Sequence, residues 1–228
     1  MGSMVTFPSN GHTCEGYLST PPDGSGPAVV VIQEWWGLVP HIRTVCDRFA
    51  QQGFVALAPD LYHGAVTKEP DDAQKRMMAL EFPRVGQDLQ GAAKWLLSSD
   101  LVTSDQVGVV GFCMGGGLAL YLASLDSEEV GAVVPYYGVT PWKEAQVSPS
   151  SIHMPVMGHW AEQDHSTPRD TIAVLERELK ASAEEVEFFW YEGCDHAFFN
   201  DDRPEVFNKD AAALSWDRTV GFLHRILG

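Results

Sequence analysis

Continuous apolar runs alternate along the chain with segments whose apolar residues recur at helical spacing. The runs, typical of strands buried on both faces, occupy the ranges 28–32, 54–58, 107–111, 131–135, 154–160 and 186–191. Helical spacing marks the ranges 42–50, 73–80, 85–96, 116–122, 172–179 and 213–227. Two short strands around the turn signal Ser9-Asn10-Gly11 are expected in the range 6–20, and a loop over 141–151. This alternation predicts a single α/β domain over residues 1–228, with a mostly parallel central sheet flanked by helices.

Polar or reactive residues come just after four of these predicted strands. Glu34 follows the run 28–32, and Cys113 follows the run 107–111. Asp164 and His196 follow the runs 154–160 and 186–191. Because sites in open α/β sheets form at the carboxyl ends of the strands, we expect these four side chains to lie at one edge of the sheet.

The stretch Gly111-Phe112-Cys113-Met114-Gly115 carries the clearest chemical signal. Its pattern, G-x-C-x-G, is a nucleophile elbow of the α/β-hydrolase fold with cysteine in the place of serine. So tight a strand-to-helix turn needs small flanking side chains, which the glycines supply. The turn also places Cys113 at a helix N-terminus, where the positive end of the helix dipole favours a thiolate. The motif therefore predicts that Cys113 is a catalytic nucleophile.

A thiol nucleophile needs a base, and the base needs an orienting group. The α/β-hydrolase fold presents them in the chain order nucleophile, acid, histidine, and Cys113, Asp164 and His196 follow that order. Asp195 competes with Asp164 for the role of the acid. Adjacent residues rarely direct their side chains at each other, so we favour Asp164 as the partner of His196. Asp170 opens a predicted helix and is interpreted as structural.

Glu34 has two interpretations. It is either a solvated loop glutamate or a neighbour of Cys113. As a neighbour, it could accept the thiol proton, or it could hold the thiol neutral until substrate binds. The backbone N–H groups of Trp35 and Met114 would then form the oxyanion hole.

Charge and composition narrow the choice of partners. The 228 residues carry a formal net charge of -16, which argues against non-specific nucleic-acid binding and against docking on anionic lipid. Any recognition of an anionic substrate would have to be local. We find no transmembrane run and no secretory signal, interpret Met1 to Ser3 as an expression scar, and expect a cytoplasmic protein.

The cysteines and histidines give no metal-binding motif. Cys14, Cys46, Cys113 and Cys194 fit neither a metal spacing nor a C-x-x-C pair, so we predict no metal. A metal-dependent hydrolase is the alternative, with ligands drawn from His153, His159, His165, His196 and Asp164. None of these residues stands at a recognised ligand spacing such as H-E-x-x-H.

The motifs Q-E-W-W-G, G-F-C-M-G-G, the Q-D loop and D-H-A-F resemble those of the dienelactone hydrolase family, the cysteine branch of the α/β-hydrolases. The resemblance covers essentially the whole chain. It implies a triad of Cys113, His196 and Asp164, with Glu34 as the family's glutamate that keeps the thiol neutral until substrate moves it. It also implies the family's type reaction, the hydrolysis of a dienelactone to maleylacetate in chloroaromatic breakdown, without a cofactor.

The chain departs from the family at the positions that grip a substrate carboxylate. Where the type enzymes have an arginine and a serine, this chain has Asn200 and Ala197. Arg76 or Arg84 is a candidate to replace the missing cation. Aromatic residues after several strands suggest an aromatic pocket, although some of them must belong to the core: Trp35, Trp36, Tyr62, Phe82, Tyr136, Tyr137, Phe198 and Phe199.

The sequence as a whole predicts a hydrolase of lactones or small carboxylic esters. Cys113 attacks the acyl carbon, and a thioacyl intermediate is then hydrolysed. The substrate is a small molecule, and a monomer and a dimer are both compatible with the sequence. The alternatives are a non-catalytic binding protein on the same fold and a redox role for Cys113 with Cys194 as its resolving thiol.

Overall fold

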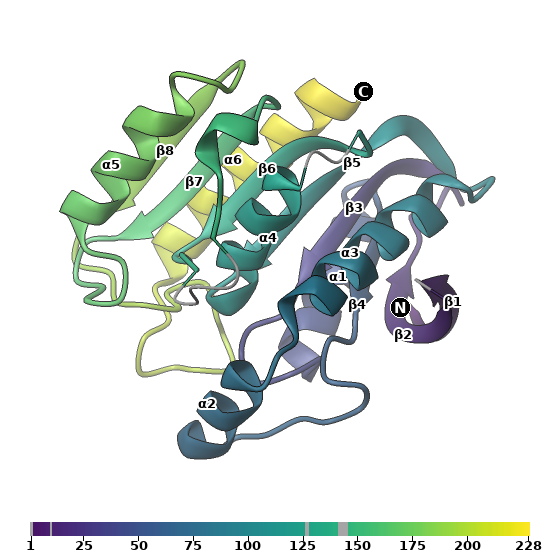
Figure 1. Ribbon diagram of the computed structural model, residues 1–228, viewed down its shortest axis with the longest axis horizontal. Coiled ribbons are helices and arrows are strands. Elements are labelled where there is room, and N and C mark those ends of the chain that lie inside the picture. The colour runs from purple at the N-terminus through teal and green to yellow at the C-terminus, as the bar shows by residue number, and fades with distance from the viewer. Residues whose placement is uncertain (1, 10, 126–127, 141–145) are drawn as a thin grey trace.

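Eight strands pair into one sheet, in the order β1-β2-β4-β3-β5-β6-β7-β8, in the computed structural model (Figure 1). The structure describes residues 2–9, 11–125, 128–140 and 146–228, and all counts below refer to these residues. The strands are β1 (Ser3–Ser9), β2 (His12–Ser19), β3 (Gly26–Ile32), β4 (Val55–Pro59), β5 (Val102–Phe112), β6 (Val130–Tyr136), β7 (Val156–Ala161) and β8 (Val186–Tyr191). The helices are α1 (Pro40–Gln51), α2 (Pro70–Met78), α3 (Phe82–Leu97), α4 (Met114–Ser124), α5 (Arg169–Leu179) and α6 (Lys209–Leu227), with a 3₁₀ turn at Pro149–Ser151.

Strands β4, β3, β5, β6, β7 and β8 run parallel to one another. At one end of the sheet, β2 pairs antiparallel with both β4 and β1. The side chains of β3 show how the core is divided. Val30 and Ile32 pack into the layer under α3, α4 and α5, while Val29 and Val31 pack into the layer under α1 and α6. Helices on both faces therefore bury this strand completely, as its continuous apolar run predicted.

The α/β architecture predicted from the sequence is confirmed, and several elements begin before their apolar patterns, β5 and α2 among them. β5 begins at Val102, before the apolar run, because Val102 pairs with Gly26 while the segment 103–106 stays largely exposed and polar. α2 begins at Pro70, since the polar first turn Pro70-Asp71-Asp72 carries no apolar periodicity. Proline at the first position of a helix loses no hydrogen bond, so it favours this start.

Parts of two predicted segments lie outside the described residues. Asn10 belongs to the expected turn between β1 and β2, and residues 141–145 belong to the expected loop over 141–151. Gly2 and Ser3 belong to the segment interpreted as an expression scar together with Met1. In the structure Ser3 pairs with Leu18 of β2, and the N–H of Gly2 donates to Asp47 Oδ1 on α1 at 2.8 Å. No helix in the described segments combines the length and the apolar character that a bilayer span requires.

The turn from β5 into α4 is the tightest point of the fold. Cys113 adopts φ 56° and ψ -118°, a conformation that L-residues rarely take. A Cβ added to Gly111 would overlap the carbonyl group of Gly115, and one added to Gly115 would overlap the carbonyl oxygen of Ile32. The glycines of the elbow therefore allow α4 to press against the ends of β5 and β3.

We expect Gly111→Ala to lower the free energy of unfolding by at least about 2 kcal/mol. The new methyl group would overlap backbone atoms of Gly115, which cannot rotate away as a side chain can. Gly221→Ala is the matched control. Gly221 is exposed on α6 with no atom within 4 Å of an added Cβ, so alanine should raise stability by about 0.5 to 1 kcal/mol. Urea unfolding of both variants measures the difference. Equal midpoints for wild type and Gly111→Ala would contradict the close approach.

Candidate active site

Asp164 and His196 are joined by a hydrogen bond between the loops that follow β7 and β8. The distance from His196 Nδ1 to Asp164 Oδ2 is 2.6 Å. Ser166 donates its N–H and its hydroxyl to Oδ1 of Asp164 at 2.8 and 2.6 Å, and the Thr167 hydroxyl donates to Oδ2 at 2.8 Å. The carboxylate is buried and fully engaged, so it fixes the orientation of the imidazole ring.

The environment of Asp164 favours its charged form. Burial alone would raise the pKa of the Asp164 carboxyl, but the hydrogen bond and charge of His196, together with Ser166 and Thr167, lower that pKa to about 2. Asp195, the competing acid, is exposed in the structure. The geometry therefore gives Asp164, and not Asp195, the hydrogen bond to His196.

His196 also interacts with the side chain of Cys113, which lines the same pocket. Burial would lower the pKa of His196, but the interaction with Cys113 and the hydrogen bond to Asp164 outweigh it and raise the pKa to about 10. The Asp164 carboxylate and the side chain of Cys113 therefore both favour a protonated imidazole at His196. This is the electrostatic arrangement that a thiol nucleophile and its base require.

Strained backbone gathers around this trio. Among the described residues other than glycine, positive φ occurs at His63, Cys113, Tyr137 and Ala197. Cys113, Tyr137 and Ala197 all line one pocket, which His196 and Asp164 also line. Residues in such conformations persist where the surrounding structure holds them, and they concentrate at functional sites.

The backbone around Cys113 offers donors for an oxyanion. Met114 is the first residue of α4, and Trp35 follows β3, so both lie at the carboxyl end of the sheet and both line the pocket. Among the described residues, the N–H groups of Trp35 and Met114 donate to no backbone carbonyl in the turns, loops and helix caps. The two N–H groups are therefore candidates for the oxyanion hole that the sequence predicted.

Glu34 is buried, with 1% of its surface exposed, so it is not a solvated loop residue. The amide Nδ2 of Asn200 donates to Oε2 of Glu34 at 2.6 Å, whereas Oε1 has no hydrogen-bond partner among the described residues. Burial raises the pKa of Glu34, and His41 and His196 counteract that rise only in part. Glu34 lines the same pocket as Cys113.

The pocket has a volume of about 590 Å³ and is lined by the residues of the trio together with aromatic, apolar and polar groups. Trp35, Trp36 and Tyr137 form part of its wall, as the sequence predicted. A second hollow of about 670 Å³, between Met78 and Gln87, contains no nucleophile and base. The described pocket of the trio is therefore the site in which a small substrate fits.

Three predicted substrate contacts are not found in this pocket. Phe198 and Phe199 are fully buried in the core layer under α1 and α6, where Phe199 stacks on Phe112 with ring centroids 5.1 Å apart. They have a packing role, which corrects their assignment to substrate binding. Arg76 is not among the lining residues and forms an ion pair with Asp72 at 2.8 Å, one turn earlier on α2.

Two residues of the site were missed by the sequence as functional candidates. Arg203 is the one arginine or lysine among the residues described as lining the pocket, where its guanidinium lies 6.0 Å from the ring centroid of Trp36. Its Nε also donates to Glu205 at 2.9 Å. Asn200 was noted only as a lost arginine, yet it is the partner of Glu34. The acidic surroundings of both residues, N-D-D-R-P-E, gave no sign of a cation site.

The histidines of the metal-hydrolase alternative do not come together. His159 is buried in the core, where Nδ1 lies 2.8 Å from the Tyr191 hydroxyl and Nε2 lies 3.0 Å from Thr219 Oγ1. Burial keeps its pKa well below the usual value, so it is a neutral structural residue. In the described part of the chain, His153, His159, His165, His196 and Asp164 form no group of three ligand atoms close enough to share a metal.

Comparison with known proteins identifies relatives along the whole chain. The model of the dienelactone hydrolase family matches residues 14–227. The protein usf of Aquifex pyrophilus is 36% identical over 233 residues, and an Aquifex aeolicus protein with the provisional name carboxymethylenebutenolidase is 34% identical; the matches cover 100% of each chain.

Solved structures show the same architecture. A provisionally named dienelactone hydrolase of Klebsiella pneumoniae superposes with a TM-score of 0.88 at 26% identity, over 98% of both chains. A dienelactone hydrolase-like promiscuous phosphotriesterase from metagenomic libraries superposes with a TM-score of 0.87 at 21% identity, over 100% of this chain and 99% of that one. The second similarity is one of fold alone.

Proposed function

The chain belongs to the dienelactone hydrolase family of ester hydrolases, and on that premise we propose that it cleaves a lactone or small carboxylic ester with Cys113 as its nucleophile. One observation carries the proposal. His196 is hydrogen-bonded to Asp164 and interacts with Cys113, and the three residues line one pocket of substrate size. Nucleophile, base and orienting acid thus have the relation that acyl transfer requires.

In the proposed acylation step, the proton of the Cys113 thiol passes to His196 Nε2, since Nδ1 is engaged with Asp164. The sulfur then forms a bond to the acyl carbon, and the carbonyl oxygen becomes an oxyanion that the N–H groups of Trp35 and Met114 stabilise. The intermediate collapses with cleavage of the carbon–oxygen bond. The leaving oxygen takes the proton from His196, and in a lactone it stays attached to the acyl chain.

Deacylation reverses the roles of the same groups. A water molecule gives its proton to His196 while its oxygen attacks the thioacyl carbon. The carbon–sulfur bond breaks, the carboxylic acid product leaves, and His196 returns its proton to the sulfur, which restores the Cys113 thiol. We expect esters to be cleaved far faster than amides, because a thiolate is expelled from the intermediate more readily than an amine.

Glu34 is proposed to control the ionisation of Cys113. Its burial and raised pKa favour a protonated carboxyl, and its unpaired Oε1 faces a site that it shares with the thiol. Asn200 holds the other oxygen. A carboxyl with one fixed and one free oxygen can take up or return a proton without leaving its position. This supports Glu34 as the residue that couples substrate entry to thiolate formation.

Arg203 is proposed to take the place of the family's carboxylate clamp. The net charge of -16 gives no long-range attraction for an anion, so recognition of an acidic substrate depends on a local cation. Arg203 lines the pocket and is half-buried against Trp36, whereas Arg76 does not reach the pocket lining. A lactone with a free carboxylate near the pocket mouth is the substrate class that fits.

Cys113→Ala should lower kcat for a lactone or an activated aryl ester by at least about a thousand-fold, because the acyl group has no other acceptor. Steady-state hydrolysis assays measure the loss, and intact-protein mass spectrometry after rapid acid quenching should show the acyl adduct in wild type only. Cys194→Ala is the control with wild-type rates. Retained turnover in Cys113→Ala would exclude the proposed mechanism. Failure of wild type to cleave any ester would favour a binding or redox role.

Glu34→Gln should reduce kcat/KM by about 100-fold or more while leaving the fold intact, because the amide keeps the shape of the side chain and loses its titrating proton. The pH profile of kcat/KM should also change, which a purely structural defect would not cause. Glu192→Gln, at an exposed position on the loop before His196, provides the control. A near-normal rate with an unchanged pH profile would reduce Glu34 to a buried structural carboxyl.

Arg203→Gln should raise KM about ten-fold for a lactone that bears a carboxylate and leave KM for its methyl ester nearly unchanged, because only the charged substrate loses an ion pair. The paired substrates are compared in the same hydrolysis assay. Arg76→Gln tests the cation that the sequence suggested and should affect neither substrate. If Arg76→Gln, and not Arg203→Gln, selectively weakens the acidic substrate, then Arg76 is the clamp.

A further inference from the structure

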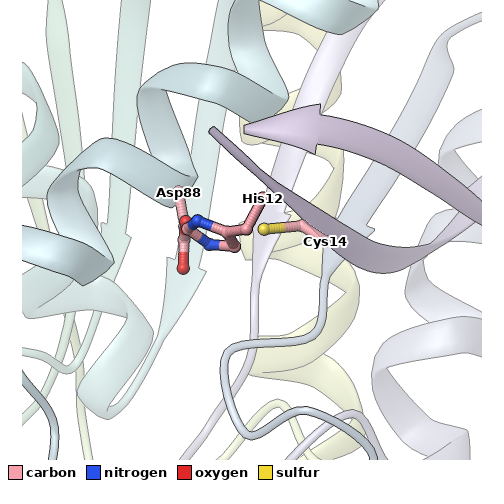
Figure 2. Close-up of side chains that lie close together, drawn as sticks. All are labelled: His12, Cys14 and Asp88. Atoms are coloured by element: carbon pink, nitrogen blue, oxygen red, sulfur yellow. The ribbon is translucent and has the colours of Figure 1, made fainter. Parts of the chain in front are cut away.

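His12, Cys14 and Asp88 form a cluster that the hydrolytic mechanism does not use (Figure 2). His12 and Cys14 lie two residues apart on β2, so their side chains point to the same face of the strand. Asp88, in the middle of α3, points at them from the helix packed over that end of the sheet. One ligand atom from each residue can be chosen so that all lie within 4.8 Å of one another.

We propose that His12, Cys14 and Asp88 bind a divalent metal ion of the zinc type. Imidazole nitrogen, thiolate sulfur and carboxylate oxygen are the three donors that Zn²⁺ accepts in proteins. Their mixed hardness favours a borderline-soft ion over Ca²⁺ or Mg²⁺, which prefer oxygen ligands throughout. Three protein ligands leave the fourth tetrahedral position to a water molecule.

The geometry needs little change to receive the ion. Zinc–ligand bonds of about 2.0 to 2.3 Å place tetrahedral donors roughly 3 to 4 Å apart. His12 Nε2 already lies 2.9 Å from Asp88 Oδ1, although the contact lacks the geometry of a hydrogen bond. This buried nitrogen has no hydrogen-bond partner among the described residues. Small side-chain rotations therefore convert the cluster into a coordination shell.

The surroundings of Asp88 hold it in place for this role. The Ser9 hydroxyl can donate to Asp88 Oδ1 at 3.3 Å or to the carbonyl oxygen of Gln87 at 3.1 Å. Arg84 Nε lies 3.9 Å from the other carboxylate oxygen, Oδ2. Hydrogen bonds of this kind orient the carboxylates that ligate metal ions.

Burial makes neutralisation of the cluster favourable. Cys14 and Asp88 are 4% and 5% exposed, and a thiolate beside a buried carboxylate is electrostatically costly without a cation. Metal binding would form the metal–sulfur bond and release the thiol proton to solvent.

The cluster is separate from the triad. In the sheet order, β2 lies next to the β1 end, while Asp164 and His196 follow β7 and β8 at the opposite end. None of the three ligands lines the substrate pocket. A metal here would join the β1–β2 hairpin to α3, so its effect would be on stability and not on the hydrolytic step.

Cobalt(II) titration of the full-length chain tests the site, because a cysteine thiolate on Co²⁺ gives a near-ultraviolet charge-transfer band. The titration uses a Cys113→Ala background, so that the active-site thiol cannot contribute. We expect one equivalent of Co²⁺ to develop the band, and Zn²⁺ to abolish it by displacement. The band should be lost in Cys14→Ser.

A second variant separates ligand loss from misfolding. His12 is partly exposed, so His12→Gln should fold and bind Co²⁺ at least about ten-fold more weakly. His153→Gln, a change at an exposed histidine away from the cluster, should bind like wild type. Zn²⁺ should raise Tm in wild type and His153→Gln but much less in His12→Gln. A band that persists in Cys14→Ser, or no band in the parent protein, would overturn the proposal.

Discussion

The close approach of α4 to the ends of β5 and β3 is the constraint on which the site depends. Because Gly111 and Gly115 have no Cβ, the backbone of α4 touches the carbonyl group of Ile32. That contact fixes two things at once. It directs Cys113 out of the sheet, and it places the residues that follow Ile32, Glu34 and Trp35, beside the nucleophile. One steric condition thus assembles parts of the site that are distant in sequence.

The two carboxyl groups of the site are tuned in opposite directions by their neighbours. Asp164 accepts hydrogen bonds on both oxygens and is favoured as an anion. Glu34 has one donor, Asn200, and burial dominates, so its neutral form is favoured. Different environments therefore give one acid the task of orienting an imidazole and the other the capacity to exchange a proton.

The sequence was informative wherever a local pattern carried the signal. Strand and helix periodicity predicted the α/β architecture, and the G-x-C-x-G turn predicted the position of Cys113. Contacts between distant segments gave no such pattern. The hydrogen bond from Asn200 to Glu34 joins residues 166 positions apart, and Asp88 meets His12 only because α3 packs over the β1–β2 end of the sheet. The sequence around Phe198 and Phe199 would be the same whether these side chains lined a ligand pocket or packed in the core, so no local pattern could distinguish the two.

The buried Glu34 and the strong negative charge of the chain also bear on what happens after the reaction. Hydrolysis of any ester or lactone creates a carboxylate, and it forms at Cys113, in the pocket that Glu34 lines. The new anion thus arises inside a molecule of net charge -16, so the repulsion comes from the molecule as a whole and not from Glu34, whose neutral form is favoured. A neutral ester pays no such repulsion on entering. The electrostatic field therefore makes the catalytic cycle directional, since it favours the departure of each product over its return.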